Sequence, residues 1–497
     1  MESKGHISWD FLKVIADTLD SYRTRALIDA KTDIISSNIY DEEQYYQILF
    51  QMIDVERLKY SLFNHLNTKK NHNFKSLKQF SKENSIDIIK TLSYLELLRN
   101  EGLIIIEYIY DNIDTAEGDS SDLSIKDLSV SSLQLIPSEV KSIYEPVKVI
   151  YETNNCSGCG LCAGICPVNC INIYNGFGKL EEDKCIRCGL CYYFCPRTYL
   201  PVKLLNMNQK NTSKIENFPK IGHYLEVYSA RTKIKEISEV CQDGGITSTC
   251  LHFLFERNEI DVALGAQMSR TLWRPEPLLI KNKDDILKTA GTKYVSNPTL
   301  SLLNELNENS SNIAVVGVPC MMQALLKSEI YNIGIPSLNK VKYRIGIFCM
   351  ESFSYESLLK ICETLSVDIN NVRKTDINKG KFFVYTHEGE QLSIPIKEIS
   401  HLARKDCKTC FDLTSESSDI SIGSIGAPSG WNTVIIRTPK GKQLFDGLVK
   451  NDLIEFKEIT EVQPGLPMVE KTANSKRNKC SKHIAKKKSE NKRIPIY

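Results

Sequence analysis

The hydrophobic positions divide the chain into a helical first part and an alternating later part. In residues 1–111 apolar side chains recur at helical spacing, for example at Leu58, Leu62 and Leu66. Across residues 220–470, strand-like apolar runs such as IAVVGVP alternate with helix-like segments such as SYESLLKICETL. Such alternation predicts α/β architecture. The chain is therefore expected to be multidomain, with a mainly helical N-terminal domain and a later α/β domain.

One stretch of the N-terminal part has a more specific pattern of predicted helices, turn and strand. From Ser76 the pattern predicts a helix to Lys82, a polar turn with Asn84, a second helix that ends at Gly102, and a strand in LIIIEYIY. Helix–turn–helix–strand resembles a winged helix. We therefore predict a winged-helix-like docking domain over residues 1–111. DNA binding is the alternative, and it is disfavoured because the stretch has no dense basic face.

Polar and charged runs mark two further segments. Residues 112–145 are rich in Asp and Ser and predict a mobile polar linker. Residues 471–497 contain ten Lys or Arg and one acidic residue. This composition predicts a basic disordered tail, with binding of an acidic partner as the alternative.

Length and charge narrow the class of protein. The 497 residues suffice for two to four domains, and the formal net charge is +2. A net charge this small gives the protein no long-range electrostatic attraction for nucleic acid or for an anionic membrane. The first residues lack an apolar signal core, and no apolar run approaches the roughly 20 residues of a membrane-spanning helix. We expect a cytoplasmic protein without a transmembrane segment, peripheral at most to a membrane complex.

The 17 cysteines are strongly clustered. None precedes Cys156, and nine lie between Cys156 and Cys195. A secreted disulfide scaffold is short and spreads its cysteines along the chain. Clustered thiols in a long chain without a signal point instead to a reducing compartment and metal ligation.

Two copies of C-x2-C-x2-C-x3-C-P lie in residues 146–205, which resemble a bacterial two-cluster ferredoxin module. In this spacing the first three cysteines hold one [4Fe–4S] cluster and the fourth ligates the other. The first cluster is assigned to Cys156, Cys159, Cys162 and Cys195. The second is assigned to Cys185, Cys188, Cys191 and Cys166. Zinc is the alternative, but eight thiols in two interleaved sets favour iron–sulfur. Cys170 is predicted to be a packing residue on a short helix.

Four cysteines of the α/β region form a second candidate set. Cys407 and Cys410 make a C-x2-C pair, whereas Cys320 and Cys349 each end a predicted strand. Strand ends gather at one edge of an α/β sheet, where ligands bind. The spacing alone leaves a third [4Fe–4S] cage and buried, inert thiols as equal alternatives.

The α/β region also resembles a known family across residues 222–468. The segments that carry the resemblance, in order and nearly without gaps, include CQDGGITSTCLHFLFE, TLWRPEPLLI, AGTKYVSNP, VVGVPCMMQALLKS, GIFCMESFSYESL, NKGKFFVYTHEGE and CKTCFDLTSESSDISIGSIGAPSGWNTVIIRT. They resemble the beta subunit of coenzyme F420-reducing hydrogenase and the related dehydrogenases, whose coenzyme is a 5-deazaflavin.

The resemblance implies FAD, coenzyme F420 as substrate, and a third [4Fe–4S] cluster on Cys320, Cys349, Cys407 and Cys410. It assigns FAD contacts to Gln242, Asp243, Gly244, Gly245, Thr247, Thr292, Lys293 and Tyr294. Independently of the resemblance, a glycine turn before a helix suits a phosphate, because the free N–H groups at the start of the helix can bind it. Gly423 and Gly426 lie in a loop whose backbone can approach a flat ring, with an ordinary turn as the alternative.

These cofactors predict a path for electrons but not the direction in which electrons flow. The catalytic residues remain unknown. A deazaflavin transfers hydride, clusters take single electrons, and a flavin does both. We expect a path from coenzyme F420 to FAD, to the Cys320 cluster, and then through the second and first clusters. The expected partner is a hydrogenase, a heterodisulfide reductase-like complex or a membrane dehydrogenase complex. The alternatives are a ferredoxin-dependent reductase of another substrate and a DNA-binding redox regulator.

Overall fold

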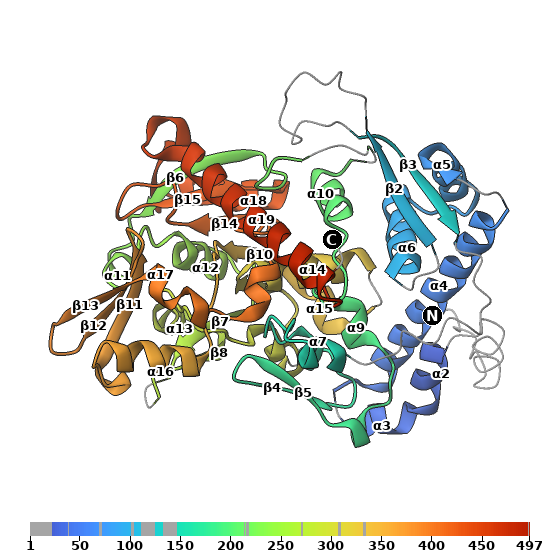
Figure 1. Cartoon of the computed structure of the whole chain (residues 1–497), viewed down its shortest axis with the longest axis horizontal. Coiled ribbons are helices and arrows are strands. Elements are labelled where there is room, and N and C mark those ends of the chain that lie inside the picture. Colours follow the sequence, from blue (N-terminus) through green and yellow to red (C-terminus); the bar gives the residue numbers. More distant parts are fainter. Residues whose placement is uncertain are drawn as a thin grey trace.

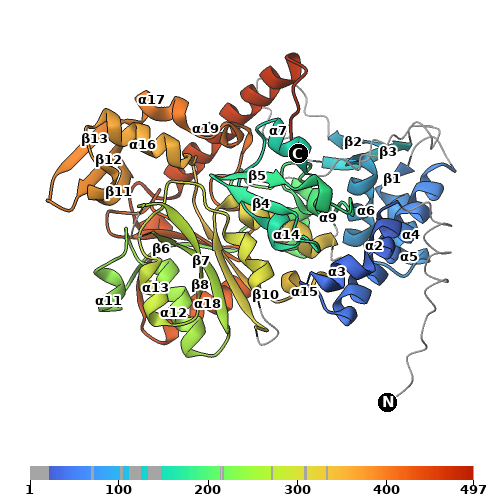
Figure 2. The ribbon, with the colours of Figure 1, turned by 90° about the horizontal axis from the view of Figure 1, so that it is seen from below.

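The computed structural model describes residues 22–37, 39–68, 72–100, 104–110, 125–132, 147–212, 214, 218–269, 272–306, 310–331, 334–495 and 497. These residues contain one eight-stranded sheet, two three-stranded sheets and one two-stranded sheet. The cysteine-rich module lies between the N-terminal helices and the large sheet (Figures 1 and 2). This central position places its thiols against both neighbouring parts.

The large sheet is mixed. Its strands, in spatial order, are β16 (Ile454–Glu458), β6 (Glu226–Thr232), β15 (Asn432–Ile436), β14 (Ile420–Gly423), β10 (Val341–Ile347), β9 (Ile313–Gly317), β7 (Val262–Met268) and β8 (Pro275–Ile280). The four strands β14, β10, β9 and β7 run parallel to one another, and the other pairings are antiparallel. The predicted α/β architecture of this region is confirmed.

Helices cover both faces of this sheet. One face carries α12 (Ile246–Glu256), α13 (Lys283–Lys288) and α18 (Pro439–Lys450); the other carries α14 (Pro319–Tyr331), α15 (Pro336–Asn339) and the 3-10 helix η3 (Thr299–Glu305). In β9, Ile313 and Val315 pack toward α14, whereas Ala314 packs toward α12. A strand buried on both faces has no polar side, which explains the unbroken apolar run in the sequence.

A small sheet extends beyond the edge of the large one. It consists of β11 (Val372–Asn378), β12 (Lys381–Thr386) and β13 (Gln391–Pro395), and it packs with α16 (Tyr355–Thr364) and α17 (Ile396–Ile399). Isolated bridges join Val295 to Phe353 and Phe353 to Ala403. These bridges tie residues 294–296 to the loop after β10.

The N-terminal part contains the predicted helix, turn, helix and strand. Its elements are α2 (Tyr22–Asp29), α3 (Lys31–Ser36), α4 (Glu42–Leu66), β1 (His72–Asn73), α5 (Phe74–Glu83), α6 (Ile88–Asn100), β2 (Ile104–Tyr110) and β3 (Ile125–Ser132). The residues of α6 from Thr91 to Leu98 are all buried, and α6 packs on α4, α10 and α14. The second helix of the predicted helix–turn–helix is therefore covered by the chain itself, which disfavours its insertion into a DNA groove, and the docking role stays a prediction.

The cysteine-rich module is short in regular structure. It contains α7 (Lys148–Glu152), α8 (Leu161–Gly164), β4 (Ile171–Tyr174), β5 (Phe177–Leu180), the 3-10 helix η2 (Glu182–Lys184), α9 (Leu190–Phe194) and α10 (Val202–Lys210). Helix α8 lies directly on η3, and Leu300 N donates a hydrogen bond to Cys159 O at 3.1 Å. A Cβ at Gly164 would collide with Leu300 O.

We expect Gly164→Ala to loosen the contact between α8 and η3. The added methyl group must displace backbone, which costs about 1–3 kcal/mol, so amide exchange in α8 is expected to speed up at least about fivefold. Hydrogen–deuterium exchange of the holoprotein measures this. Gly380→Ala is the control, because nothing lies within 4 Å of a Cβ there and the strain of its φ of +74° falls in the turn between β11 and β12. Equal protection of α8 in both variants would contradict the expected contact.

Three expectations about local structure are wrong. Residues 471–497 are not a disordered tail, because α19 (Gly465–Ser489) is a helix with Val469, Ala473 and Cys480 buried. These side chains form one apolar stripe at helical spacing, which the overall basic composition obscured. The predicted linker contains strand β3, and the rest of it lies outside the described residues. Cys170 precedes β4 and is not on a helix.

Among the described residues, no helix is long and apolar enough to cross a membrane.

Candidate metal and cofactor site

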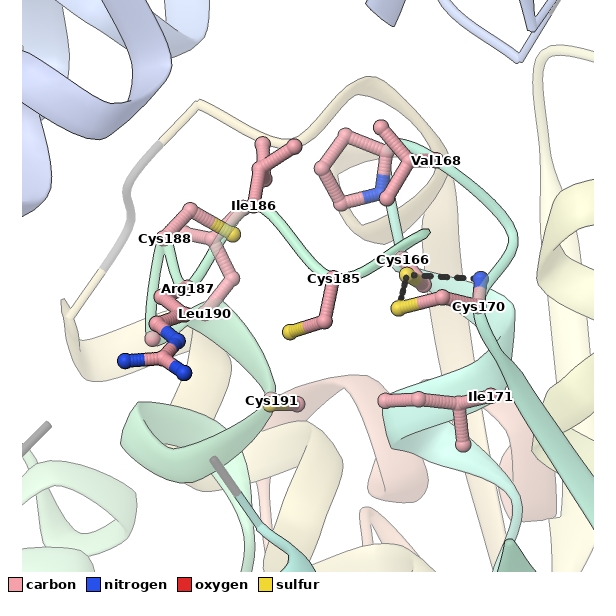
Figure 3. Close-up of a pocket in the computed structure, with 12 residues that line it drawn as sticks. Cys166, Val168, Cys170, Ile171, Cys185, Ile186, Arg187, Cys188, Leu190 and Cys191 are labelled. Carbon is pink, nitrogen blue, oxygen red and sulfur yellow. Dashed lines mark hydrogen bonds between the residues drawn. The ribbon is translucent and has the colours of Figure 1, made fainter. Parts of the chain in front are cut away.

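Five cysteines surround one void in the cysteine-rich module (Figure 3): Cys166, Cys170, Cys185, Cys188 and Cys191. Four of them are the set predicted for the second cluster. The fifth, Cys170, has its Sγ 3.4 Å from the Sγ of Cys166, and its backbone N–H donates to the same Cys166 sulfur. Cys170 is therefore a hydrogen-bonding neighbour of a predicted ligand, a role that its sequence position did not reveal.

A second void in the module is lined by the set predicted for the first cluster. Cys156, Cys159, Cys162 and Cys195 surround it. The fourth cysteine of each motif thus lies with the first three of the other motif. The structure brings the eight thiols together in the interleaved arrangement expected from their spacing, and metal ligation by them remains a prediction.

Backbone and hydroxyl groups donate to the sulfurs of the first void. Gly158 N–H donates to Cys156 Sγ and Arg197 N–H to Cys195 Sγ, both at 3.4 Å, and Tyr151 Oη lies 3.0 Å from Cys162 Sγ. Such contacts stabilise thiolate ligands of iron–sulfur clusters. Within the described ranges, no group of three or more His, Cys, Asp or Glu side chains is arranged to hold a single metal ion. The thiols surround voids instead, and this donor set fits clusters.

The third cysteine set also comes together, at the edge where the parallel strands end. Cys320 follows β9 on α14, Cys349 follows β10, and Cys407 lies on the 3-10 helix η6 (Lys405–Thr409). Cys349 N donates to Leu413 O at 2.8 Å, which holds this strand end against the segment after Cys410. Burial raises the pKa of Cys349 to about 11, and the charge of the neighbouring Cys410 adds to this shift.

The third set lies beside the first void. Burial raises the pKa of Cys320, Arg197 opposes the shift, and charges on Cys159 and Cys410 add to it. Cys320 is thus within electrostatic reach of a first-cluster thiol. The sequence-based path led from the Cys320 cluster to the second cluster, whereas the thiol of the ferredoxin module that acts on Cys320 belongs to the first set; the electron path itself stays a prediction.

Arg197 occupies the region between the third set and the first void. Its guanidinium is 2% exposed, lies 3.8 Å from the Asp406 carboxylate, and donates to the Tyr497 hydroxyl at 3.2 Å. Its charge lowers the pKa of Cys159 and Cys195 of the first void and of Cys320 of the third set, although burial raises all three overall. One buried cation therefore favours the thiolate form on both sides.

Two buried lysines also hold the cages. Lys476 of α19 donates from Nζ to Cys349 O at 2.5 Å and to Asp412 O at 2.7 Å. Burial opposes its charge, but the neighbouring Cys410, Cys349 and Cys407 outweigh burial and raise the pKa of Lys476. Lys327 of α14 donates to Cys195 O and Tyr199 O, each at 2.8 Å. The charged Lys476 can stabilise an added electron on a nearby cluster, whereas burial lowers the pKa of Lys327 well below its usual range, so that Lys327 acts here through its hydrogen bonds.

The predicted FAD loop 242–247 lies where β6 and β15 meet the start of α12. Gly245 has φ +73° and precedes α12, while a Cβ at Gly244 would lie 2.6 Å from Ala230 O. Both polar side-chain atoms of Gln242 are buried without a hydrogen-bond partner among the described residues. Buried polar groups normally have partners, so Gln242 fits a position that contacts a cofactor. Thr247 lies in the first turn of α12.

The second predicted FAD segment faces the first. Burial raises the pKa of Tyr294, and the charges of Asp376 and Asp243 add to the shift, so Asp243 and Tyr294 are neighbours. Thr292 is exposed beside them. Lys293 Nζ donates to the carbonyls of Thr289, Ala290 and Gly291, just after α13. Burial lowers the pKa of Lys293 to about 7, and its amino group is directed to a helix end and not into the loop 242–247.

The glycines of the loop after β14 have structural partners. A Cβ at Gly423 would collide with Phe348, and one at Gly426 would lie 2.6 Å from Val469 Cγ2 of α19. Gly426 also has φ +95° and accepts a hydrogen bond from Gly465 N. Close packing of Phe348 and α19 is sufficient to require both glycines, as the ordinary-turn alternative expects.

Sequence reasoning missed Arg197, Lys327, Asp406 and Lys476. The first follows the Cys195-Pro196 end of a motif, and Asp406 directly precedes Cys407, so proximity to predicted ligands could have indicated these two. Lys327 and Lys476 carried no such local signal.

Comparison with known proteins places these features in context. Residues 227–304 and 310–462 match the family models described as coenzyme F420 hydrogenase/dehydrogenase, beta subunit N-term and C terminus. Residues 179–197 match the model of a 4Fe-4S binding domain.

The chain is similar to the coenzyme F420 hydrogenase subunit beta of Methanothermobacter thermautotrophicus, with 37% identity over 54% of this chain and 96% of that protein. It is similar to one of the subunits of the F(420)H(2) dehydrogenase of Methanosarcina mazei, with 35% identity over 66% of this chain and 91% of that protein. A solved chain of the F420-reducing [NiFe] hydrogenase complex from Methanosarcina barkeri aligns with a TM-score of 0.53 and 37% identity, over 55% of this chain and 94% of that one.

Proposed function

The chain belongs to the family of coenzyme F420 hydrogenase/dehydrogenase beta subunits, and from that premise we propose that it exchanges hydride between coenzyme F420 and FAD and single electrons with a protein partner. At the coarser level it is a coenzyme F420-dependent oxidoreductase with an iron–sulfur binding region. The observation that carries the finer proposal is that Cys320 packs against the core cluster that contains Cys159 of the first void and interacts with it electrostatically. This proximity supports a continuous route from the third set into the ferredoxin module.

The residues of the chain have distinct parts in this proposal. Gln242, Asp243 and Tyr294 would hold FAD in the loop region beside the carboxyl end of the sheet. When bound there, FAD supplies the exchange between two-electron and one-electron chemistry. The third cluster would be ligated by Cys320, Cys349, Cys407 and Cys410. The charge of Arg197 would favour the thiolate form of the ligands of the third cluster and of the first cluster. The second void then follows the first, since Cys191 and Cys162 interact electrostatically.

The coverage of the relatives bears on the type of partner. The match to the dehydrogenase protein spans 66% of the chain, against 54% for the hydrogenase protein. A coenzyme F420-dependent sulfite reductase of Methanocaldococcus jannaschii matches over 70% of the chain at 31% identity, so the wider matches support a setting other than a hydrogenase, of the dehydrogenase or the reductase type.

We expect anaerobically purified protein to contain about 12 irons per chain and one FAD, because each of three cages holds four irons. Reduced coenzyme F420 should bleach the flavin absorbance under anoxia, and an iron–sulfur electron paramagnetic resonance signal should then appear. Iron, sulfide and flavin assays with stopped-flow absorbance measure this.

Unchanged flavin absorbance after addition of reduced coenzyme F420 would overturn the proposal. If reduced ferredoxin instead reduces the flavin, the chain is a ferredoxin-dependent reductase on the same scaffold. About eight irons would leave only the ferredoxin module loaded.

A further inference from the structure

Helix α19 lies across the third cysteine set and the first void. At its middle, Lys476 donates to Cys349 O and Asp412 O. One turn later, Cys480 is 3% exposed and packs in the same apolar cluster as Phe411, which follows Cys410. Near its end, Lys487 Nζ donates to Asn155 Oδ1 at 2.7 Å, directly before Cys156. In Figure 1 the helix runs as one red rod over the centre of the molecule.

The outer side of α19 is strongly basic. Lys479, Lys482 and Lys486 are exposed and recur at i, i+3 and i+7, so they form one stripe along the helix. Lys408 is exposed on η6, which packs against α19. We call these four residues, Lys408, Lys479, Lys482 and Lys486, the lysine surface.

Few acidic groups balance the lysine surface. Glu490 lies 3.9 Å from Lys486 and 2.7 Å from Lys492, and the half-buried Glu351 is within electrostatic reach of Lys408 and Lys479. In the part of the chain that the structure describes, Lys408, Lys479 and Lys482 form no ion pair within 4 Å. The chain as a whole is nearly neutral, with a net charge of +2, so this concentration of cations is local. Like charges on one helix face destabilise it, and a bound anionic partner would remove that cost.

We infer that the lysine surface is the docking site for a small acidic one-electron carrier protein of the ferredoxin type. This inference rests on the proposed function, because it supplies the exchange of single electrons with a partner. The thiols of the third set and the first void lie directly beneath α19, so a carrier bound there is separated from them by one helix. Complementary charge would also steer the encounter and make its rate depend on ionic strength.

The test is direct binding of an acidic two-[4Fe–4S] ferredoxin to the anaerobic holoprotein by calorimetry, which needs no coenzyme F420. In the variant Lys479→Glu/Lys482→Glu/Lys486→Glu, we expect the dissociation constant at low salt to rise at least about tenfold. The salt dependence of binding should flatten as well. Unchanged iron content checks that the variant is folded and loaded.

The N-terminal helix α5 offers a matched control. Lys75, Lys78 and Lys82 are exposed at the same i, i+3 and i+7 spacing, so Lys75→Glu/Lys78→Glu/Lys82→Glu changes the net charge equally. The dissociation constant for ferredoxin should stay within about twofold of the value for the parent protein. The charges introduced on α5 act over roughly one Debye length, and the proposed docking site is on α19.

Three results would overturn the inference. The first is that ferredoxin does not bind the parent protein, and the second is that both triple variants weaken ferredoxin binding equally. The third is that the lysine surface is needed for binding double-stranded DNA or anionic vesicles but not for binding ferredoxin. Failure of the proposed function gives a different result, because flavin bleaching by reduced coenzyme F420 would then be absent while ferredoxin binding is still measured.

Discussion

The double variant Cys407→Ala/Cys410→Ala is expected to lose about four of the 12 irons per chain. These two thiols are half of the set that we propose as ligands of the third cluster, and the other two thiols, Cys320 and Cys349, would not retain a cube alone. Reduced coenzyme F420 should still bleach the flavin, because the loops around Gln242 and Tyr294 are untouched. Electron delivery to an acceptor protein should fall at least about 100-fold, since the route from flavin to the first void is interrupted. Iron assays and stopped-flow absorbance measure the two effects.

The control for this variant removes two other buried cysteines. Cys250 lies in the apolar core between α12 and the large sheet, and Cys362 lies in the core of the small sheet. Cys250→Ala/Cys362→Ala should keep about 12 irons and normal electron delivery, because neither thiol lines a cage. Loss of the same four irons in the control, or full iron content in Cys407→Ala/Cys410→Ala, would show that the third set consists of inert thiols.

Replacing Lys476 with methionine is expected to lower the reduction potential of the third cluster by at least about 60 mV, a tenfold change in a one-electron equilibrium. The ammonium is 5% exposed and lies against the carbonyls of Cys349 and Asp412. A reduced cluster carries one more negative charge, and in a buried setting loss of a neighbouring cation disfavours it. Anaerobic redox titration followed by electron paramagnetic resonance measures the potential.

Two further variants separate charge from packing. Lys479→Met changes an exposed lysine on the same helix, and screening by water should leave the potential within about 10 mV of the parent value. Lys476→Arg keeps the charge and should restore most of the potential. An equal shift in Lys476→Met and Lys479→Met, or no shift in either, would contradict the role given to Lys476.

Local sequence patterns determined much of this protein. The alternation of strand and helix segments predicts the α/β sheet, because residues buried on both faces of a strand must all be apolar. The interleaved pairing of the eight cysteines also follows from their spacing, since three thiols at intervals of three reach one cage and the fourth reaches the next. Both features depend on residues that are only a few positions apart. Over that range the spacing along the sequence determines how side chains are placed in space.

Contacts between distant segments were decided only by the tertiary structure. Lys476 lies 127 residues from the carbonyl of Cys349 to which it donates, and Lys327 lies 132 residues from Cys195. Composition suggested that residues 471–497 would be disordered, because ten basic residues outweighed the few apolar ones. The stripe of Val469, Ala473 and Cys480 packs on apolar side chains of other segments, such as Ile435 of the large sheet and Phe411 after Cys410, so burial against them folds the segment into α19. The approach of Cys320 to the core cluster that contains Cys159, within the electrostatic reach of Arg197, is likewise a result of packing between distant segments.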